Sequence, residues 1–208
     1  MPPHGLAAAS QECRSRSTTD GLVVKLDFPA SLISRDLEPS DVLLLAEARP
    51  LLEPNTADSP LVRAAQLAHE REGHFAVRHE VFVRDQKLFP HTDMDEHDDH
   101  PSTIHLVGEA DGLIVGAVRI YTTVGPNCWQ GDRLAVHRQH RASHLGIDLV
   151  QLAVSTAAAL GGTVMEAHVQ VSNVRFFEYL GWQTHGPREI YVGTPHQPMT
   201  IDLTSLVQ

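Results

Sequence analysis

The spacing of apolar residues predicts a mixed α/β domain that begins near residue 60. Alternating apolar residues flank Ala110-Asp111-Gly112, and an Asp-Gly turn between such runs favours an antiparallel hairpin. Leucines that recur every three or four residues from 145 to 160 predict one face of a long helix, which Gly161-Gly162 ends. Other apolar runs predict strands at 61–67, 129–136, 163–169, 189–193 and 199–203, a helix at 69–85 and a short helix at 173–180. The predicted order is β-α-β-β-β-α-β-α-β-β.

The first 59 residues lack this regular pattern. Residues 1–20 are small and polar without periodicity, which predicts a mobile tail. Residues 21–59 carry short apolar runs and end in the linker-like EPNTADSP, so we interpret them as an N-terminal extension. The predicted main domain is 60–208.

Composition and charge argue against nucleic-acid and membrane partners. The chain has 16 Lys and Arg against 26 Asp and Glu, a formal charge of −10. An acidic chain is poorly suited to neutralising phosphates, so we expect no nucleic-acid partner. No apolar run approaches the roughly 18 residues of a membrane span, and the N-terminus has no signal-peptide core. We therefore expect a cytoplasmic protein with no membrane partner.

The segment HTDMDEHDDHP (91–101) concentrates acidic and imidazole groups. We expect a solvated acidic loop that acts as a lid. A rim that attracts a cationic substrate and a metal site are the alternatives. A calcium-binding loop is excluded because Asp98 stands where that loop needs glycine. We expect no metal.

The segment most informative about chemistry is a strand, a short loop and a long helix. The loop RASHLG (141–146) lies where the helix begins. A helix N-terminus presents unpaired N–H groups and a partial positive charge, which suits a pyrophosphate. The loop is neither a Walker motif nor a dinucleotide-binding fingerprint.

This arrangement resembles the acyl-CoA signature of the GNAT N-acetyltransferases, in which (Q/R)-x-x-G-x-(G/A) follows a strand ending in L-x-V. The segment FFEYLGW (176–182) is similar to the family's F-Y-E-K-L-G-F motif. The segments R-x-x-V-F-V-x-x-Q (78–86), AHVQ (167–170) and PH-x-x-M (195–199) resemble the ElaA-like bacterial branch. The resemblance covers about 60–203 and implies the GNAT-type mixed central sheet flanked by helices.

The resemblance implies where an acyl-CoA would bind. The backbone of the strand would bind the pantetheine arm, and the loop and first helical turn would bind the pyrophosphate, with Arg141 as an added cation. The thioester would lie where strands 129–136 and 163–169 separate, often at a β-bulge. The implied donor site comprises Leu134, Ala135, Val136, Arg141, Ala142, Ser143, His144, Leu145, Gly146, Ile147 and Phe177.

Two positions depart from the family pattern. His144 replaces the middle glycine of the loop, which is compatible with backbone donors if the residue does not need a positive φ. Phe177 replaces the tyrosine that often protonates the leaving thiolate, and phenylalanine has no proton to donate. The second departure motivates a non-catalytic alternative.

The implied reaction is direct attack of an amine on the thioester. An alkyl amine arrives protonated, because its pKa is near 10.4, so a group must accept a proton. The candidates by strand position are Glu166, Asp132 and His168. Either carboxylate could instead pair with an arginine such as Arg133 or Arg119.

The sequence therefore predicts an acetyl-CoA-dependent N-acetyltransferase that acts on a small-molecule amine. A non-catalytic acyl-CoA sensor and a peptide or protein N-acetyltransferase are the alternatives. Whether the chain forms a homodimer is left open.

Overall fold

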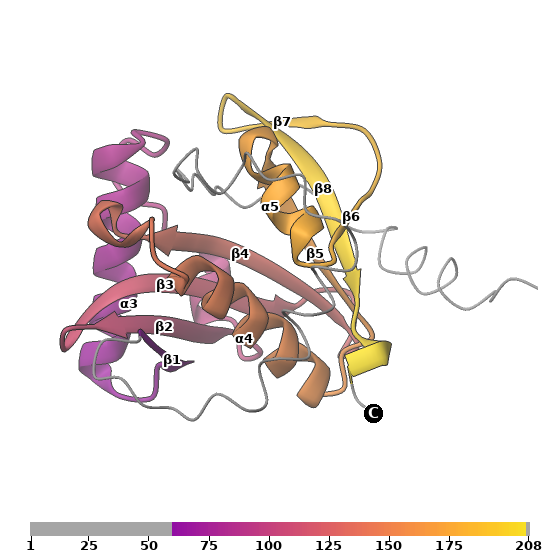
Figure 1. Ribbon diagram of the computed structural model, residues 1–208, viewed down its shortest axis with the longest axis horizontal. Coiled ribbons are helices and arrows are strands. Elements are labelled where there is room, and N and C mark those ends of the chain that lie inside the picture. The colour runs from indigo at the N-terminus through magenta and orange to yellow at the C-terminus, as the bar shows by residue number, and fades with distance from the viewer. Residues whose placement is uncertain (1–59, 207–208) are drawn as a thin grey trace, which may run out of the picture.

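The computed structural model describes residues 60–206, and the predicted tail 1–20 and extension 21–59 lie outside them. One sheet runs in the order β1-β2-β3-β4-β5-β8-β6, with β7 on β8 (Figure 1). The strands are β1 (Leu61–Ala64), β2 (Ile104–Ala110), β3 (Leu113–Thr122), β4 (Cys128–Val136), β5 (Val164–Gln170), β6 (Gln183–Thr184), β7 (Glu189–Tyr191) and β8 (Thr194–Asp202). The helices are α3 (Ala68–Arg78), α4 (Leu145–Ala159) and α5 (Val174–Tyr179). A π-helical segment, η3 (His79–Asp85), continues α3, and the 3₁₀ turns are η4 (Glu96–Asp99), η5 (Arg138–His140), η6 (Val171–Asn173) and η7 (Thr204–Leu206).

The predicted mixed α/β order is confirmed, with the two-residue β6 added. The β2–β3 hairpin forms at the predicted turn, where Ala110 pairs with Leu113. Asp111 and Gly112 both have positive φ, 52° and 76°, as a two-residue hairpin turn requires. No helix of residues 60–206 is long and apolar enough to cross a membrane.

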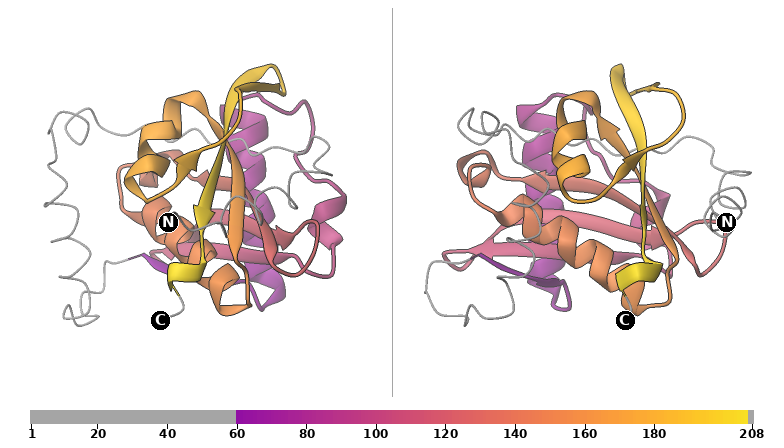
Figure 2. Two further views of the ribbon diagram at one scale, coloured as in Figure 1. Left: turned by 90° about the vertical axis from the view of Figure 1, so that its right-hand side faces the viewer. Right: turned by 45° about the vertical axis from the view of Figure 1, so that its right-hand side comes forward.

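The helices α3 and α4 cover opposite faces of the sheet (Figures 1 and 2). On one face α4 packs into the larger core cluster with residues of β2, β3, β4 and β5. On the other face α3 and η3 contribute Val77, Val81 and Phe82 to a smaller cluster, which includes Ala117 and Ala135 of the sheet. The two faces of the sheet are therefore covered by separate cores, a larger one under α4 and a smaller one under α3 and η3.

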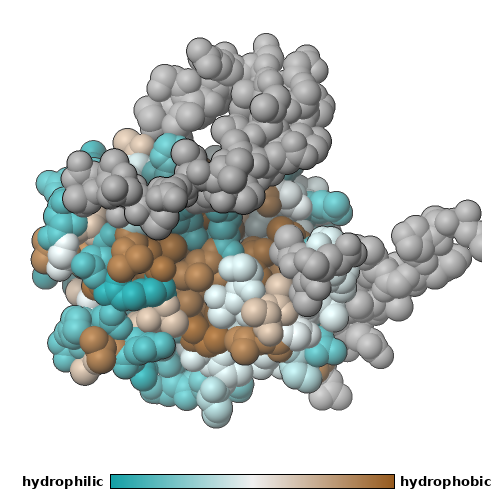
Figure 3. All heavy atoms as spheres, turned by 60° about the horizontal axis from the view of Figure 1, so that its bottom comes forward, coloured by the Kyte–Doolittle hydropathy of each residue, from teal (hydrophilic) through white to brown (hydrophobic). Residues whose placement is uncertain are grey.

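The buried face of α4 differs from the leucine stripe that predicted it. Leu145 and Leu149 are fully buried, but Leu160 is 56% exposed. The core contacts continue instead through smaller residues, among them Ala153 and Ala157. Not all hydrophobic residues are buried, because some lie together on one outer face of the molecule (Figure 3). Leucine spacing alone therefore located the helix but not its whole buried face.

A pair of glycines receives the first turn of α4. Gly108 of β2 and Gly116 of β3 are cross-strand partners. A Cβ atom at Gly116 would lie 2.9 Å from a methyl group of Leu145 and 2.8 Å from one of Leu149. A Cβ atom at Gly108 would also clash with Leu145. The missing side chains let α4 approach the sheet closely, so we call Gly108 and Gly116 the glycine seat.

Candidate active site

The strands β4 and β5 separate partway along their length. They pair in parallel over three residues only, and the last pair is Gln130 with Glu166. Beyond it β4 continues to Val136 on β3, and β5 continues to Gln170 on β8. The predicted opening between these strands is therefore present, and among residues 60–206 no strand pairs with the edge of either arm that faces the gap.

A β-bulge accompanies the opening. Between Ala117 and Arg119 of β3 lies one residue, whereas between their partners Asp132 and Ala135 of β4 lie two. The extra residue is accommodated with Arg133 at a φ of 53°, a left-handed conformation that is uncommon for a residue other than glycine. Such backbone persists only when the surroundings hold it in place.

The β4 arm carries the predicted pantetheine segment. Leu134 is the second residue of the bulge, Ala135 and Val136 follow it, and all three side chains are buried in the cores on the two faces. The backbone of this arm is thus fixed, while its second edge has no strand partner in residues 60–206. An extended ligand can bind along such an edge as a further strand would.

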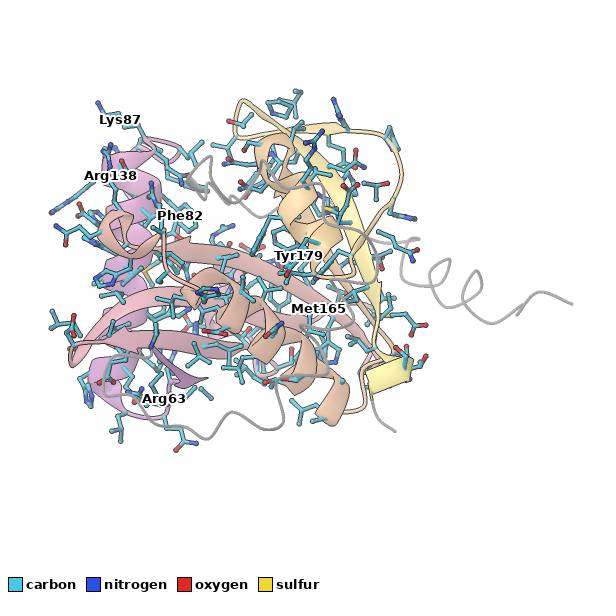
Figure 4. The ribbon with its side chains drawn as sticks, viewed as in Figure 1. Arg63, Phe82, Lys87, Arg138, Met165 and Tyr179 are labelled. Carbon is cyan, nitrogen blue, oxygen red and sulfur yellow. The ribbon has the colours of Figure 1, made fainter. Side chains whose placement is uncertain are left out.

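A small apolar cavity lies beside the opening, on the α4 face. Its lining comes from both arms, including Gly131 and Leu134 of β4 and Met165 and Ala167 of β5. Phe177 of α5 closes it, with its ring 5.4 Å from that of Trp182. Phe177 therefore lies at the gap, and it offers only hydrocarbon there. Tyr179, two residues on, is exposed at the end of α5 (Figure 4).

The first turn of α4 presents backbone N–H groups beside the β4 arm. The amide of Asp148 donates to the His144 carbonyl (3.0 Å), and the amide of Leu145 donates to Ser143 Oγ (3.3 Å). The amides of Gly146 and Ile147 precede the first full helical hydrogen bond, as at any helix start. His144 has a φ of −75°, so replacing the family glycine introduces no strain.

Arg141 is a structural part of this loop. Its Nε donates to the Val136 carbonyl (3.1 Å), and its Nη2 lies 2.5 Å from Asp85. The side chain is buried, so it anchors the loop to the end of β4 and to η3. The exposed cation is Arg138, whose side chain is 79% exposed, and Lys87 lies at the same end of the molecule (Figure 4). Arg138 precedes the loop and was not among the predicted site residues; its Nη1 lies 3.8 Å from Asp85.

The opposite face of the opening carries polar side chains in register. Tyr121 pairs with Gln130, and Gln130 pairs with Glu166, so the three share one row across β3, β4 and β5. Glu166 is partly exposed at the point of separation. Burial raises the pKa of Tyr121, whose ring stacks on that of His97 with centroids 4.4 Å apart. The row therefore offers one carboxylate and neutral hydrogen-bonding groups.

His168 lies two residues beyond Glu166, on the open arm of β5. Its Nδ1 is 3.3 Å from Oε2 of Glu189 on β7. The β7–β8 hairpin also brings Tyr191 against the smaller core cluster and within 5.6 Å of the His196 ring, centroid to centroid. The hairpin thus covers this side of the opening.

Asp132 is bound in an ion pair, contrary to its predicted role as a proton acceptor. It is completely buried, and Arg119 donates to both its oxygens, from Nε at 2.7 Å and from Nη2 at 2.6 Å. A carboxylate held in this way has no oxygen directed at the gap. The alternative that it pairs with an arginine is the one that the structure bears out, so we do not retain Asp132 as a candidate base.

The acidic loop is solvated only in part, because Glu96 and Asp99 are exposed whereas its other aspartates bind arginines. Asp93 and Asp98 are buried and lie 2.7 and 2.5 Å from nitrogens of Arg78. Asp95 binds two further arginines, at 2.5 and 2.6 Å. Burial opposes ionisation of Asp98, but hydrogen bonds and charge from Arg78 outweigh it and lower its pKa. The buried charge cluster comprises Arg78, Arg119, Arg133, Asp93, Asp95, Asp98 and Asp132. Within residues 60–206, no three His, Cys, Asp or Glu side chains are arranged to hold a metal ion.

Comparison with known proteins agrees with this architecture. Residues 67–182 match the sequence model of the Acetyltransferase (GNAT) family. Escherichia coli ElaA is 18% identical, with 70% of this chain and 99% of that chain covered and a TM-score of 0.62. An acyl-CoA N-acyltransferase from Pseudomonas aeruginosa is 22% identical (69% and 98% covered, TM-score 0.60). The CoA-dependent acyl-homoserine lactone synthase BjaI is 18% identical (71% and 85% covered, TM-score 0.62). At these identities the likeness establishes the fold.

Proposed function

Because the chain belongs to the acetyltransferase (GNAT) family, whose members transfer acyl groups from coenzyme A, we propose that it transfers an acetyl group from acetyl-CoA to a small-molecule amine. The observation that carries this proposal is the opening between β4 and β5 beside the first turn of α4. The predicted cytoplasmic location suits both substrates.

The donor site combines a strand edge with a helix N-terminus. The pantetheine arm would lie along Leu134, Ala135 and Val136, as the family resemblance implies. The amides of the loop and of the first turn of α4 would bind the pyrophosphate, since a helix N-terminus favours an anion without any net positive charge. This matters in a chain of formal charge −10. Arg141 holds the loop in place from behind, and Arg138 is the accessible cation nearby.

The size of the apolar cavity supports a short acyl group. Met165, Phe177 and Trp182 are buried and line this small cavity beside the strand arms. A methyl group fits such a space more readily than a long chain, because cores at this packing density accept added carbons only with strain. Thiol release from acetyl-CoA should therefore exceed release from hexanoyl-CoA.

The polar face of the opening supports an amine acceptor. Glu166 and Glu189 are carboxylates on this side, and each arginine of the buried charge cluster is already paired with aspartates. The local charge is therefore negative, which raises the concentration of a cationic amine. Cover from the β7–β8 hairpin favours a small acceptor over an extended peptide.

In the proposed reaction the amine attacks the thioester carbonyl directly, with no covalent intermediate on the protein. A backbone N–H near Val136 would stabilise the oxyanion. Glu166 and His168 are the two groups on β5 placed to accept the proton of the amine. Since Phe177 cannot protonate the thiolate, we expect the sulfur to take its proton from water.

The test is thiol release from acetyl-CoA across a panel of small amines, with short peptides as a second panel. We expect release with at least one small amine and none with peptides. Binding of CoA without turnover on any acceptor would support a sensor instead. Release with peptides alone would support a peptide N-acetyltransferase.

A further inference from the structure

Building on the proposed function, we infer that His168 accepts the proton of the acceptor amine and that Glu189, on the β7–β8 hairpin, is the positioning residue that holds its ring. The inference adds a residue that no motif indicated, and it makes the C-terminal hairpin part of the catalytic apparatus.

The position of His168 on β5 separates it from Glu166. Glu166 occupies the last residue pair between β4 and β5, where the two strands are still joined. His168 lies two residues farther on, where β5 has left β4 but still pairs with β8 through Pro198. Strand residues two apart face the same side. His168 therefore faces the acceptor side from within the opening, whereas Glu166 lies at its closed end.

The contact with Glu189 gives the ring its direction. Glu189 is the partner of His196 in the β7–β8 pair, and His196 is also the partner of Gln170 in the β5–β8 pair. The side chain of Glu189 thus reaches across β8 to the Nδ1 side of His168, 3.3 Å away. A carboxylate at Nδ1 favours the tautomer that leaves Nε2 free to accept a proton, the arrangement by which an acid residue orients a histidine base.

The exposed fractions of the His168 and Glu189 side chains are compatible with release of the proton to solvent. The side chain of His168 is 16% exposed, and that of Glu189 is 50% exposed. The imidazole is shielded enough to be held in one orientation, yet it can return a proton to water after each turnover.

The ammonium of the acceptor gives one proton to Nε2 of His168, which frees the nitrogen lone pair. The nitrogen bonds to the thioester carbonyl carbon, and the C–S bond breaks with its electron pair on sulfur. The second proton lost from nitrogen reaches the thiolate through water. The products are the amide and the CoA thiol, and His168 releases its proton to solvent.

The experiment measures thiol release and CoA affinity in the full chain, in three single variants and in one double variant. With His168→Ala, kcat should fall by about 100-fold, the lower end of what general-base catalysis contributes. Added imidazole should restore part of the rate. With Glu189→Gln, kcat should fall by about tenfold, the lower end of what removing a carboxylate behind a functional histidine causes. Glu178→Gln, an exposed glutamate on α5, is the matched control and should leave kcat unchanged.

The double variant distinguishes positioning from independent effects. If Glu189 acts through His168, Glu189→Gln should lower kcat no further in the His168→Ala background. The affinity for CoA should be unchanged in all variants. A Glu189 that contacted the acceptor by itself would instead give multiplicative losses, and this would overturn the positioning role.

Failure of the inference and failure of the proposed function give different results. Unchanged turnover in His168→Ala, or no rescue by imidazole, would overturn the inference while the transferase activity remained. Binding of CoA without thiol release by the unaltered chain would overturn the proposed function, and the proton transfer with it.

Discussion

The glycine seat makes a quantitative prediction about how the sheet supports the CoA site. In Gly116→Val the new Cβ would begin 2.8 and 2.9 Å from methyl groups of Leu149 and Leu145. Ordinary carbon contacts are about 3.5–4.0 Å, so the leucines must move by roughly 1 Å. Overpacking of this kind costs about 1–3 kcal/mol. We expect the free energy of unfolding to fall by about 2 kcal/mol.

The displacement should also reach the donor site. Leu145 is the first residue of α4, so moving it moves the amides of Gly146 and Ile147 that follow. An anion at a helix N-terminus gains up to about 2 kcal/mol from its position there. We expect the dissociation constant for CoA to rise about tenfold, equivalent to about 1.4 kcal/mol.

Urea unfolding and calorimetric titration with CoA would measure the two effects. The matched control is Gly73→Val in α3, whose Cβ would lie 2.8 Å from two atoms of Ile114 on the opposite face of the sheet. The control should lose comparable stability and keep its CoA affinity. If both variants weaken CoA binding equally, the glycine seat does not set the position of the phosphate-binding amides.

Three further predictions concern separate parts of the molecule. Gly146→Glu should abolish CoA binding in a titration, because it places a carboxylate beside the amides that bind phosphate; unchanged affinity would remove the loop from the donor site. Asp132→Asn should lower the free energy of unfolding by about 1.5–3 kcal/mol, because Arg119 loses a charged hydrogen-bond partner while it stays paired with Asp95 and Asp98; a loss below about 1 kcal/mol in urea would contradict this. Burial lowers the pKa of His74 and of His105 in the folded chain. As the pH falls, these histidines therefore take up protons near pH 6.5 in the unfolded chain before they do so in the folded chain. The free energy of unfolding should thus fall as the pH drops from about 6.5 towards 5. The variant His74→Phe should flatten that slope in urea titrations at several pH values, and an equal slope would show that the titration lies elsewhere.

Local patterns predicted the parts of the fold that depend on neighbouring residues. The Asp111-Gly112 turn, the α4 helix and the loop before it were all visible because turn chemistry and helical periodicity act over a few positions. The family motifs predict the donor site on the strand and the loop, and this stays a prediction. Phe177 was recognised as a departure, and its place at the apolar cavity follows from its position in α5.

The features that the sequence did not predict depend on contacts between segments that are distant in the chain. The sequence suggested that the acidic loop is solvent-exposed, because the charges within the loop have one sign. The arginines that pair with its aspartates lie on α3, β3 and β4, which are distant in the sequence. Asp132 looked like a base because its position on the strand was right, while its neighbour Arg119 is set by the β3–β4 register. Glu189 carried no signal, since it reaches His168 only through the pairing of β7 and β5 with β8.

The buried charge cluster also constrains how this sequence can change over time. Three arginines and four aspartates from separate segments neutralise one another away from water, with a formal excess of one negative charge. Replacing an arginine increases this excess and leaves buried carboxylates uncompensated, whereas removing a bonded Arg–Asp pair together leaves the excess unchanged. Substitutions here should therefore be inherited in pairs of opposite charge. Correlated substitutions among related sequences should therefore identify these long-range ion pairs, which a single sequence does not indicate.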